Sequence, residues 1–200
     1  MSRLTVACVL RSGGVYDASH VERLRDQVAG NLGPHRFVCL ADCEVPCERI
    51  PLETDWPGWW AKLELFKHDL GPVAFLDLDV TVQGPIEWLR DAAACTPLAM
   101  MRNFRFPKHL ASAVMAWTGP RPQIAEGFDR SLVPQWRQRP DRWGDQGWIE
   151  HRVPHAIRMQ DRFPGEIASF RRPREASAAS IVVWFGPVKP WSAVGGNAHA

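Results

Sequence analysis

Two aspartates, Asp77 and Asp79, are the residues of this 200-residue chain whose type and spacing most directly suggest chemistry. They follow the apolar run 73–76 (VAFL), which is typical of a buried strand. In open α/β sheets, ligands bind at the carboxyl ends of the strands. Paired carboxylates suit a hard divalent ion, Mn²⁺ or Mg²⁺, that completes its shell with water and phosphate oxygens. The pattern therefore predicts a metal and phosphate site at Asp77 and Asp79.

The same stretch, VAFLDLDVT, also matches the strand-DxDxT signature of haloacid-dehalogenase phosphatases, in which the first aspartate, here Asp77, is the nucleophile. That signature normally opens its domain and is followed much later by an acidic GDxxxD motif. Here 76 residues precede Asp77, and the only Gly-Asp pair, Gly144-Asp145, continues as QGWI without the second aspartate. The phosphatase hypothesis remains an alternative with less support.

The elements around the aspartates indicate an α/β fold. A strand is expected at 4–10, and a capping box at Ser19 and Glu22 then precedes apolar residues with helical spacing up to position 32. A second strand is expected at 36–41, and strand–helix–strand order is typical of a parallel sheet. Further strands are expected at 97–101, 112–117 and 181–184, and helices at 59–70, 123–131 and 145–150. Residues 192–200 contain no core-forming side chains, so we expect a flexible tail.

Composition indicates a compact globular chain, because 46% of the residues are hydrophobic and 23% are charged. No apolar run approaches the length of a membrane span or a signal peptide. The five cysteines match no zinc or iron–sulfur spacing. We therefore expect a cytoplasmic protein with reduced thiols and no membrane span.

The charge is uneven, although the net charge is only +2. Residues 102–174 contain 14 Lys and Arg against 7 Asp and Glu. An arginine-rich tract suits phosphate or carboxylate partners, because guanidinium groups bind these oxyanions in bidentate fashion. Its charge is spread over the whole tract rather than clustered with aromatic stacking motifs, which argues against nucleic acid.

Five segments together resemble the DxD-containing glycosyltransferases of the GT-A fold, in particular the family 8, glycogenin-like group and its short bacterial and phage relatives. The segments are 58–66 (GWWAKLELF), 75–80 (FLDLDV), 112–117 (SAVMAW), 144–146 (GDQ) with 148–149 (WI), and 186–191 (GPVKPW). They occur in the family's order and span most of the chain. The resemblance implies one α/β/α domain over residues 1–191 with a mixed, mostly parallel sheet, of the nucleotide-diphospho-sugar transferase type.

The resemblance also implies an activity: transfer of a sugar from a nucleotide-diphosphate donor, a UDP-sugar, to an unidentified acceptor, with metal assistance and retention of anomeric configuration. Asp77 would face the ribose and the metal ion, and Asp79 would bind the ion that neutralises the leaving diphosphate. Lys62 would lie near the donor phosphates. Lys189 would stabilise the diphosphate charge as the glycosidic bond breaks. Gly186 and Trp191 belong to the same closing donor-binding motif as Lys189.

Asp145 and Gln146 match the family segment that lines the sugar pocket beside the anomeric carbon. With Lys189 they are the catalytic residues that the resemblance implies. Among the ten tryptophans, Trp59 and Trp191 are two of five candidates for a stacking face, of which we expect at most three to line the cleft. The acceptor side would consist of the loops 102–110 and 130–142, and the basic tract that contains them favours an anionic acceptor.

One departure from the family concerns the metal site. A histidine normally stands just before the closing glycine, whereas this chain has Val183, Trp184 and Phe185 there. Either water takes the place of the imidazole and metal binding is weaker, or the chain is a nucleotide-sugar-binding protein without catalysis. His199 in the tail is the first candidate for a replacement ligand, followed by His151 and His155.

Overall fold

The computed structural model describes residues 3–137 and 144–193. The strands are β1 (Thr5–Leu10), β2 (Arg36–Ala41), β3 (Glu48–Pro51), β4 (Pro72–Leu76), β5 (Val80–Val82), β6 (Ala99–Arg102), β7 (Leu110–Thr118), β8 (Ile157–Arg158), β9 (Ile167–Ser169) and β10 (Ile181–Val183). The α-helices are α1 (Ala18–Asn31), α2 (Trp88–Ala93), α3 (Pro122–Ala125), α4 (Val133–Arg137), α5 (Gly144–Arg152), α6 (Met159–Arg162), α7 (Pro173–Ala178) and α8 (Pro190–Ala193). Two 3₁₀ helices, η1 (Gly58–Lys67) and η2 (Arg130–Leu132), complete the elements. In the described ranges, no helix is long and apolar enough to cross a membrane.

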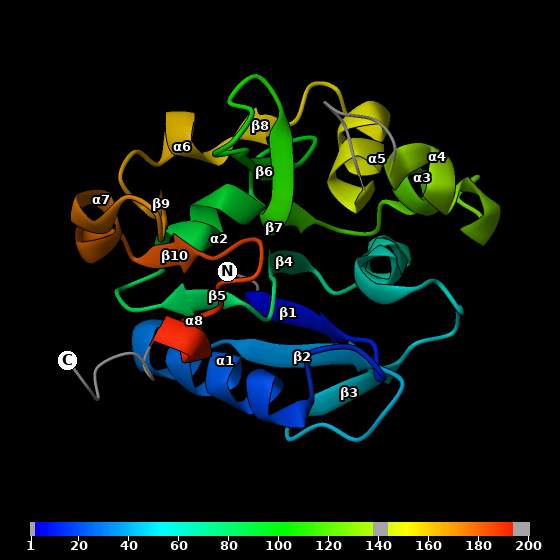
Figure 1. The fold of residues 1–200 in the computed structure, drawn as a ribbon, viewed down its shortest axis with the longest axis horizontal. Helices are drawn as coiled ribbons and strands as arrows, with labels where there is room; N and C mark the ends of the chain where they lie inside the picture. Colours follow the sequence, from blue (N-terminus) through cyan, green and yellow to red (C-terminus); the bar gives the residue numbers. More distant parts are fainter. Residues whose placement is uncertain (1–2, 138–143, 194–200) are drawn as a thin grey trace.

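A seven-stranded sheet in the order β3-β2-β1-β4-β7-β6-β8 forms the centre of the molecule (Figure 1). The pairs β1–β2, β2–β3, β1–β4 and β6–β8 are parallel, whereas β7 is antiparallel to both of its neighbours. The expected mixed, mostly parallel sheet is therefore confirmed. Because β7 runs against β4, the beginning of β7 lies at the same edge of the sheet as the end of β4.

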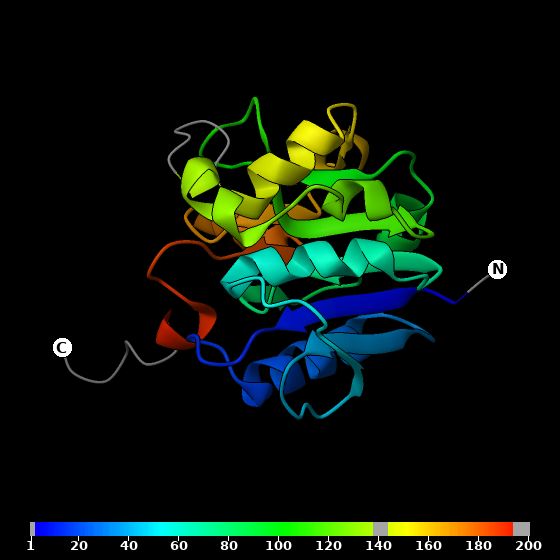
Figure 2. The ribbon, with the colours of Figure 1, turned by 90° about the vertical axis from the view of Figure 1, so that its right-hand side faces the viewer.

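The core has two halves, one on each face of this sheet. On one face, α1 buries Val21, Leu24 and Val28 in a cluster that also includes side chains of α2 and of the small sheet β5-β10-β9. On the other face, η1, α3 and α5 bury an aromatic cluster that includes Trp60 and Trp117. Figure 2 shows η1 and α5 lying across the sheet on that second face. The η1 side chains from Trp60 to Phe66 are all buried, because α3 and α5 cover η1 from outside.

The expected strands at 4–10, 36–41, 73–76, 97–101, 112–117 and 181–184 correspond to β1, β2, β4, β6, β7 and β10. The short strands β3, β5, β8 and β9 were not predicted. They contain two to four residues, which is too short for a period-2 pattern to be detected.

Three expectations about helices need correction. The helix expected at 123–131 ends at Ala125, because Gly127 takes a positive φ of 72° that turns the chain, and two short helices follow. The segment at 59–70 is the 3₁₀ helix η1 rather than an α-helix. The N-cap of α1 is Asp17, whose box partner is His20, instead of Ser19 with Glu22.

The flexible tail was expected at 192–200. Residues 194–200 of it, which include the candidate ligand His199, lie outside the described residues. Ser192 belongs to α8. All five cysteines are free thiols, as expected.

Candidate active site

Asp77 and Asp79 lie in the tight turn that joins the two sheets. The Asp77 backbone N–H donates to the Ala113 carbonyl of β7 over 2.9 Å, and the Val80 N–H donates to the Asp77 carbonyl over 3.2 Å. The chain therefore leaves the large sheet at Leu76 and enters the small sheet at Val80. This turn places both carboxylates at the carboxyl end of β4, as the sequence predicts.

Lys62 connects the turn to α5 through a buried network. Its side chain is 4% exposed, and its ammonium donates to Asp77 Oδ1 over 2.8 Å and to Ser112 Oγ over 3.2 Å. The same ammonium lies 3.1 Å from Asp145 Oδ2, and the Ser112 hydroxyl donates to that oxygen over 2.5 Å. Residues from η1, β4, β7 and α5 thus meet at one point. Lys62 and Asp145, expected near the donor, are brought together with Asp77.

The electrostatics of this network hold Lys62 in its charged form and disfavour the charge on Asp77. Burial opposes the Lys62 ammonium, but the carboxylates of Asp145 and Asp77 outweigh it and raise the pKa of Lys62. Burial raises the pKa of Asp77 to about 6, although Lys62 counteracts this, and Asp79 and Asp145 add to the rise. A buried carboxylate with other carboxylates nearby is stabilised by any cation that approaches. The cluster therefore attracts positive charge.

Asp79 has partners from the first loop and from the closing segment, which we define as residues 186–193. Its side chain is 11% exposed, and Oδ2 accepts the Tyr16 hydroxyl over 2.9 Å and the Lys189 ammonium over 2.6 Å. Burial and the neighbouring Asp79 charge raise the pKa of Tyr16, which keeps its hydroxyl a donor. The predicted pair Asp79 and Lys189 is thus in direct contact.

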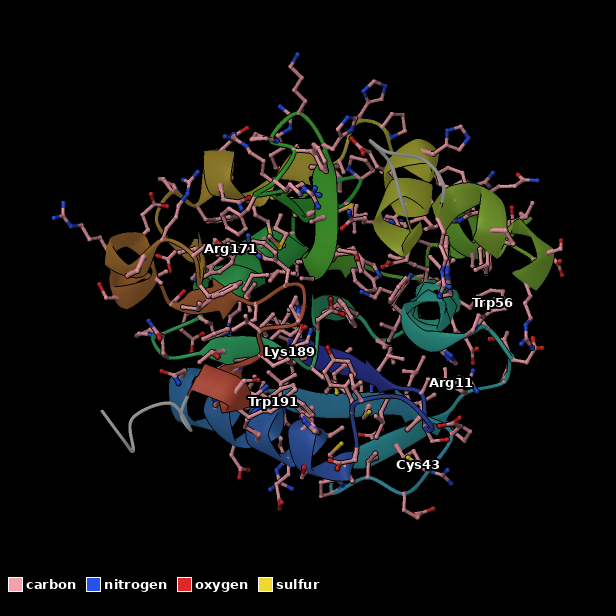
Figure 3. All side chains as sticks on the ribbon, in the orientation of Figure 1. Arg11, Cys43, Trp56, Arg171, Lys189 and Trp191 are labelled. Atoms are coloured by element: carbon pink, nitrogen blue, oxygen red, sulfur yellow. The ribbon has the colours of Figure 1, made fainter. Side chains whose placement is uncertain are left out.

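The closing segment covers the aspartate turn from the side of α1. It turns at Gly186, whose φ is 77°. Its Trp191 ring lies edge-on to His20 and Tyr16, with ring centroids 4.3 and 5.9 Å apart. Arg23 lies 5.7 Å from the same ring and donates to the Leu78 carbonyl over 2.5 Å. Figure 3 shows Lys189 and Trp191 side by side in front of the sheet.

The positions where the family has its histidine serve packing in this chain. Val183 is buried at the end of β10, and Trp184 stacks on Phe170 at a centroid distance of 4.8 Å. The Trp184 indole donates to Thr81 Oγ1 over 3.0 Å, while Phe185 packs against Phe170. His151, one expected replacement, packs against Trp136 on α4 instead. Within the described residues, the partners of the Asp79 carboxylate are Tyr16 and Lys189, and no hydrogen bond or ion pair joins it to an imidazole.

The donor set fits a shared divalent ion better than a self-sufficient metal site. Across residues 3–137 and 144–193, no cluster of three or more His, Cys, Asp or Glu side chains could hold a metal. In the same ranges, Asp77 Oδ2 and Asp79 Oδ1 accept no hydrogen bond. Mg²⁺ needs only one or two carboxylates when water and phosphate oxygens complete its shell. The two free oxygens fit that requirement.

The beginning of α5 forms the other wall of the site. Gln146 is half-buried next to Asp145. Trp59 is 43% exposed and packs against Gly144, the first residue of α5. The contact is so close that a Cβ added at Gly144 would lie 3.2 Å from the indole nitrogen. Trp60, Trp117 and Trp148 are core residues. Of the five candidates, Trp59 and Trp191 are exposed, and their role as stacking faces stays a prediction.

Sequence reasoning missed Tyr16, Arg23 and Ser112 as site residues. Tyr16 is the only tyrosine of the chain. The one sequence signal for a role in the site was its position in the loop between a glycine pair and the N-cap residue Asp17. Ser112 opens a segment that carried the resemblance, but nothing in a strand pattern shows which side chain meets Lys62. Arg23 lies on α1, where a basic residue normally indicates an exposed face.

Solved glycosyltransferases share the fold of this chain, although no family model and no curated protein sequence matches it. The galactosyltransferase LgtC, solved with donor and acceptor sugar analogues, is 13% identical with a TM-score of 0.61 over 94% of this chain and 89% of LgtC. The glycosyltransferase GlyE of Streptococcus pneumoniae is 12% identical with a TM-score of 0.63 over 96% of this chain. The bifunctional glycosyltransferase WbbM is 9% identical with a TM-score of 0.62 over 95%. The chain spans 56% of GlyE and 47% of WbbM.

These similarities confirm the fold class expected from the sequence, an α/β/α fold of the GT-A glycosyltransferase type. At such low identities they describe the arrangement of the elements only.

Proposed function

We propose that this protein is a glycosyltransferase that moves a sugar from a nucleotide-diphosphate donor, a UDP-sugar, to an acceptor. The observation that carries the proposal is the cluster of Lys62, Asp77, Asp79, Asp145 and Lys189 at the carboxyl ends of the central strands. Open α/β sheets bind ligands at this edge. Three carboxylates and two lysines there suit a ligand that carries both a diphosphate with its cation and sugar hydroxyls.

We propose Asp77 and Asp79 as the ligands of a Mn²⁺ or Mg²⁺ ion that the donor diphosphate shares. Bound there, the ion would act as a Lewis acid on the leaving diphosphate. The free oxygens Asp77 Oδ2 and Asp79 Oδ1 support this assignment, since the other oxygen of each carboxylate already has a protein partner. The absence of a third protein ligand implies that the nucleotide contributes part of the shell.

Lys62 keeps the site ionised and in position. Because one ammonium contacts both Asp77 and Asp145, it fixes the metal-binding turn relative to the wall that would contact the sugar. Asp145 and Gln146 would bind sugar hydroxyls there. Lys189 would leave Asp79 when donor enters and would stabilise the charge on the departing diphosphate. The positive φ of Gly186 would let the closing segment change direction as Lys189 moves from Asp79 to the diphosphate. Trp191 would hold the same segment against α1 through its contact with His20.

Retention of configuration by front-face attack fits this arrangement best. Asp145, the carboxylate at the sugar wall, is held by Lys62 at 3.1 Å and by Ser112 at 2.5 Å. The paired Lys62 ammonium withdraws negative charge from this carboxylate, which weakens it as the nucleophile of a double displacement. The acceptor hydroxyl would therefore attack from the side that the diphosphate leaves, and a phosphate oxygen would accept its proton.

A binding protein without catalysis is the second candidate, and the packing of Val183, Trp184 and Phe185 in place of the histidine is the observation in its favour. The phosphatase alternative gains no support, because Lys62 engages the Asp77 carboxylate and the similar structures are glycosyltransferases.

Release of UDP from a panel of UDP-sugars with Mn²⁺ tests the proposal. We expect slow hydrolysis of one donor by the wild type and its loss in Asp79→Asn. Asp55→Asn is the matched control, because Asp55 makes only a surface ion pair with Arg130. Tight UDP binding without turnover of any donor would favour the binding protein, and equal turnover in Asp79→Asn would refute the role of Asp79.

A further inference from the structure

A cavity of about 390 Å³ lies outside the aspartate cluster, between α5, β8 and α6. Its wall includes Leu110 of β7, Glu150 of α5, Arg158 of β8, and Asp161 and Arg162 of α6. This volume is in the range of small-molecule sites. Nothing in the chemistry assigned to Asp77, Asp79 and Lys189 uses it.

The charged side chains of the cavity leave two arginines without a counter-ion. Asp161 is paired with Arg102, and Glu150 lies 3.2 Å from His109 Nδ1. Arg158, by contrast, donates to the Lys108 carbonyl over 3.0 Å and has no acidic partner within residues 3–137 and 144–193. In the described part of the chain, Arg162 has no acidic partner. Both acids of the wall are thus engaged, whereas both guanidinium groups remain available to a ligand.

The cavity and the donor site share two elements. Leu110 stands two residues before Ser112 on β7, and Glu150 stands five residues after Asp145 on α5. Each separation corresponds to about 7 Å along its element. An acceptor with its reactive hydroxyl near Asp145 could therefore extend into the cavity, provided that the group placed there suits two arginines.

We propose that this cavity binds an oxyanion, a phosphate or a carboxylate, carried by the acceptor of the sugar transfer; the inference rests on the proposed function. Arginine binds both groups through paired N–H donors, and these charge-assisted bonds are stronger than neutral ones. The surrounding tract of 14 Lys and Arg against 7 Asp and Glu would attract such an acceptor over a longer range. A neutral acceptor would leave both guanidinium groups without a counter-ion in the described part of the chain.

The probes are methyl phosphate and sodium acetate, titrated by two-dimensional NMR into the protein saturated with UDP and Mg²⁺, a diamagnetic ion, so that the donor site is filled. We expect saturable shifts at the amides of β8 and α6. Arg162→Gln and Arg158→Gln should each weaken binding of the preferred probe at least about fivefold, since a charged hydrogen bond contributes more than one tenfold step in affinity. Arg174→Gln on α7 is the matched control and should bind like the wild type. The tighter probe assigns the group as phosphate or carboxylate.

Binding that persists in both arginine variants, or no saturable binding to the wild type, would overturn the inference. Calorimetry of UDP with the nucleotide-free wild type separates this result from failure of the proposed function. If UDP binds and the probes do not, the cavity assignment alone is wrong. If neither UDP nor any UDP-sugar binds, the proposed function is wrong and the acceptor role of the cavity fails with it.

Discussion

Replacing Lys189 should have opposite effects on metal binding in the free protein and on donor turnover. In the structure the Lys189 ammonium lies 2.6 Å from Asp79 Oδ2, with the two side chains 19% and 11% exposed. It therefore occupies one oxygen of a proposed metal ligand and adds a positive charge beside it. Lys189→Ala removes this competitor, so we expect Mn²⁺ to bind the free variant more tightly than the free wild type.

The size of the effect follows from the geometry of the contact. A hydrogen bond to a charged group contributes about 1.5–3 kcal/mol. If Mn²⁺ must displace Lys189 fully, its removal should raise Mn²⁺ affinity about 10- to 150-fold. The Tyr16 hydroxyl, which donates to the same oxygen over 2.9 Å, remains in the variant and keeps the expected change near the lower end.

Titration calorimetry of Mn²⁺ with and without UDP measures both halves of the prediction. In the wild type, Mn²⁺ should bind poorly alone and well with UDP, and by reciprocity Mn²⁺ should raise UDP affinity by the same factor. In Lys189→Ala, Mn²⁺ alone should bind better, whereas donor turnover should fall because the diphosphate loses a cation. Lys67→Ala, an exposed lysine at the end of η1, is the control.

Weaker or unchanged Mn²⁺ binding by free Lys189→Ala would refute the competition between Lys189 and the ion. Tight Mn²⁺ binding by the wild type without nucleotide would show that a further ligand exists, with His199 the first to test. UDP binding that is indifferent to Mn²⁺ would favour the binding-protein alternative.

Three further predictions concern the residues around this pair. Lys62→Met should lower the free energy of unfolding by about 3–5 kcal/mol, measured by urea denaturation, because it leaves Asp77 and Asp145 without their buried cation; Lys67→Met should change it little. Gln146→Ala should reduce turnover more than UDP affinity, since it should contact the sugar, and an equal loss of both would contradict that role. Asp17, whose hydrogen bonds to Ser19 and His20 lower its pKa to about 2, should stabilise the protein above its ordinary pKa and lose this contribution as the pH falls through about 2. The free energies of unfolding of the wild type and Asp17→Asn should therefore differ most above the ordinary Asp pKa of 3.8, and the difference should disappear as the pH falls through about 2.

The sequence by itself determined the six longer strands and the place of the two aspartates. The apolar run before Asp77 predicted a buried strand with the carboxylates at its carboxyl end, and the structure confirms that placement. The order of the motifs likewise predicted Lys62, Asp145 and Lys189 as site residues, and this role stays a prediction. The sequence did not predict the 3₁₀ conformation of η1, because 3₁₀ and α periodicities differ little over ten residues and seven consecutive ones are buried without an exposed face.

Only the tertiary structure decided which charges meet. The local sequence around Lys62 does not distinguish it from a solvated helix lysine. Packing of η1 beneath α3 and α5 buries it between Asp77 and Asp145, which follow it by 15 and 83 positions in the chain. Tyr16 and Lys189 reach the same oxygen of Asp79 from opposite ends of the chain. Local periodicity carries no information about such contacts, because they depend on how separate elements pack and not on the residues beside them.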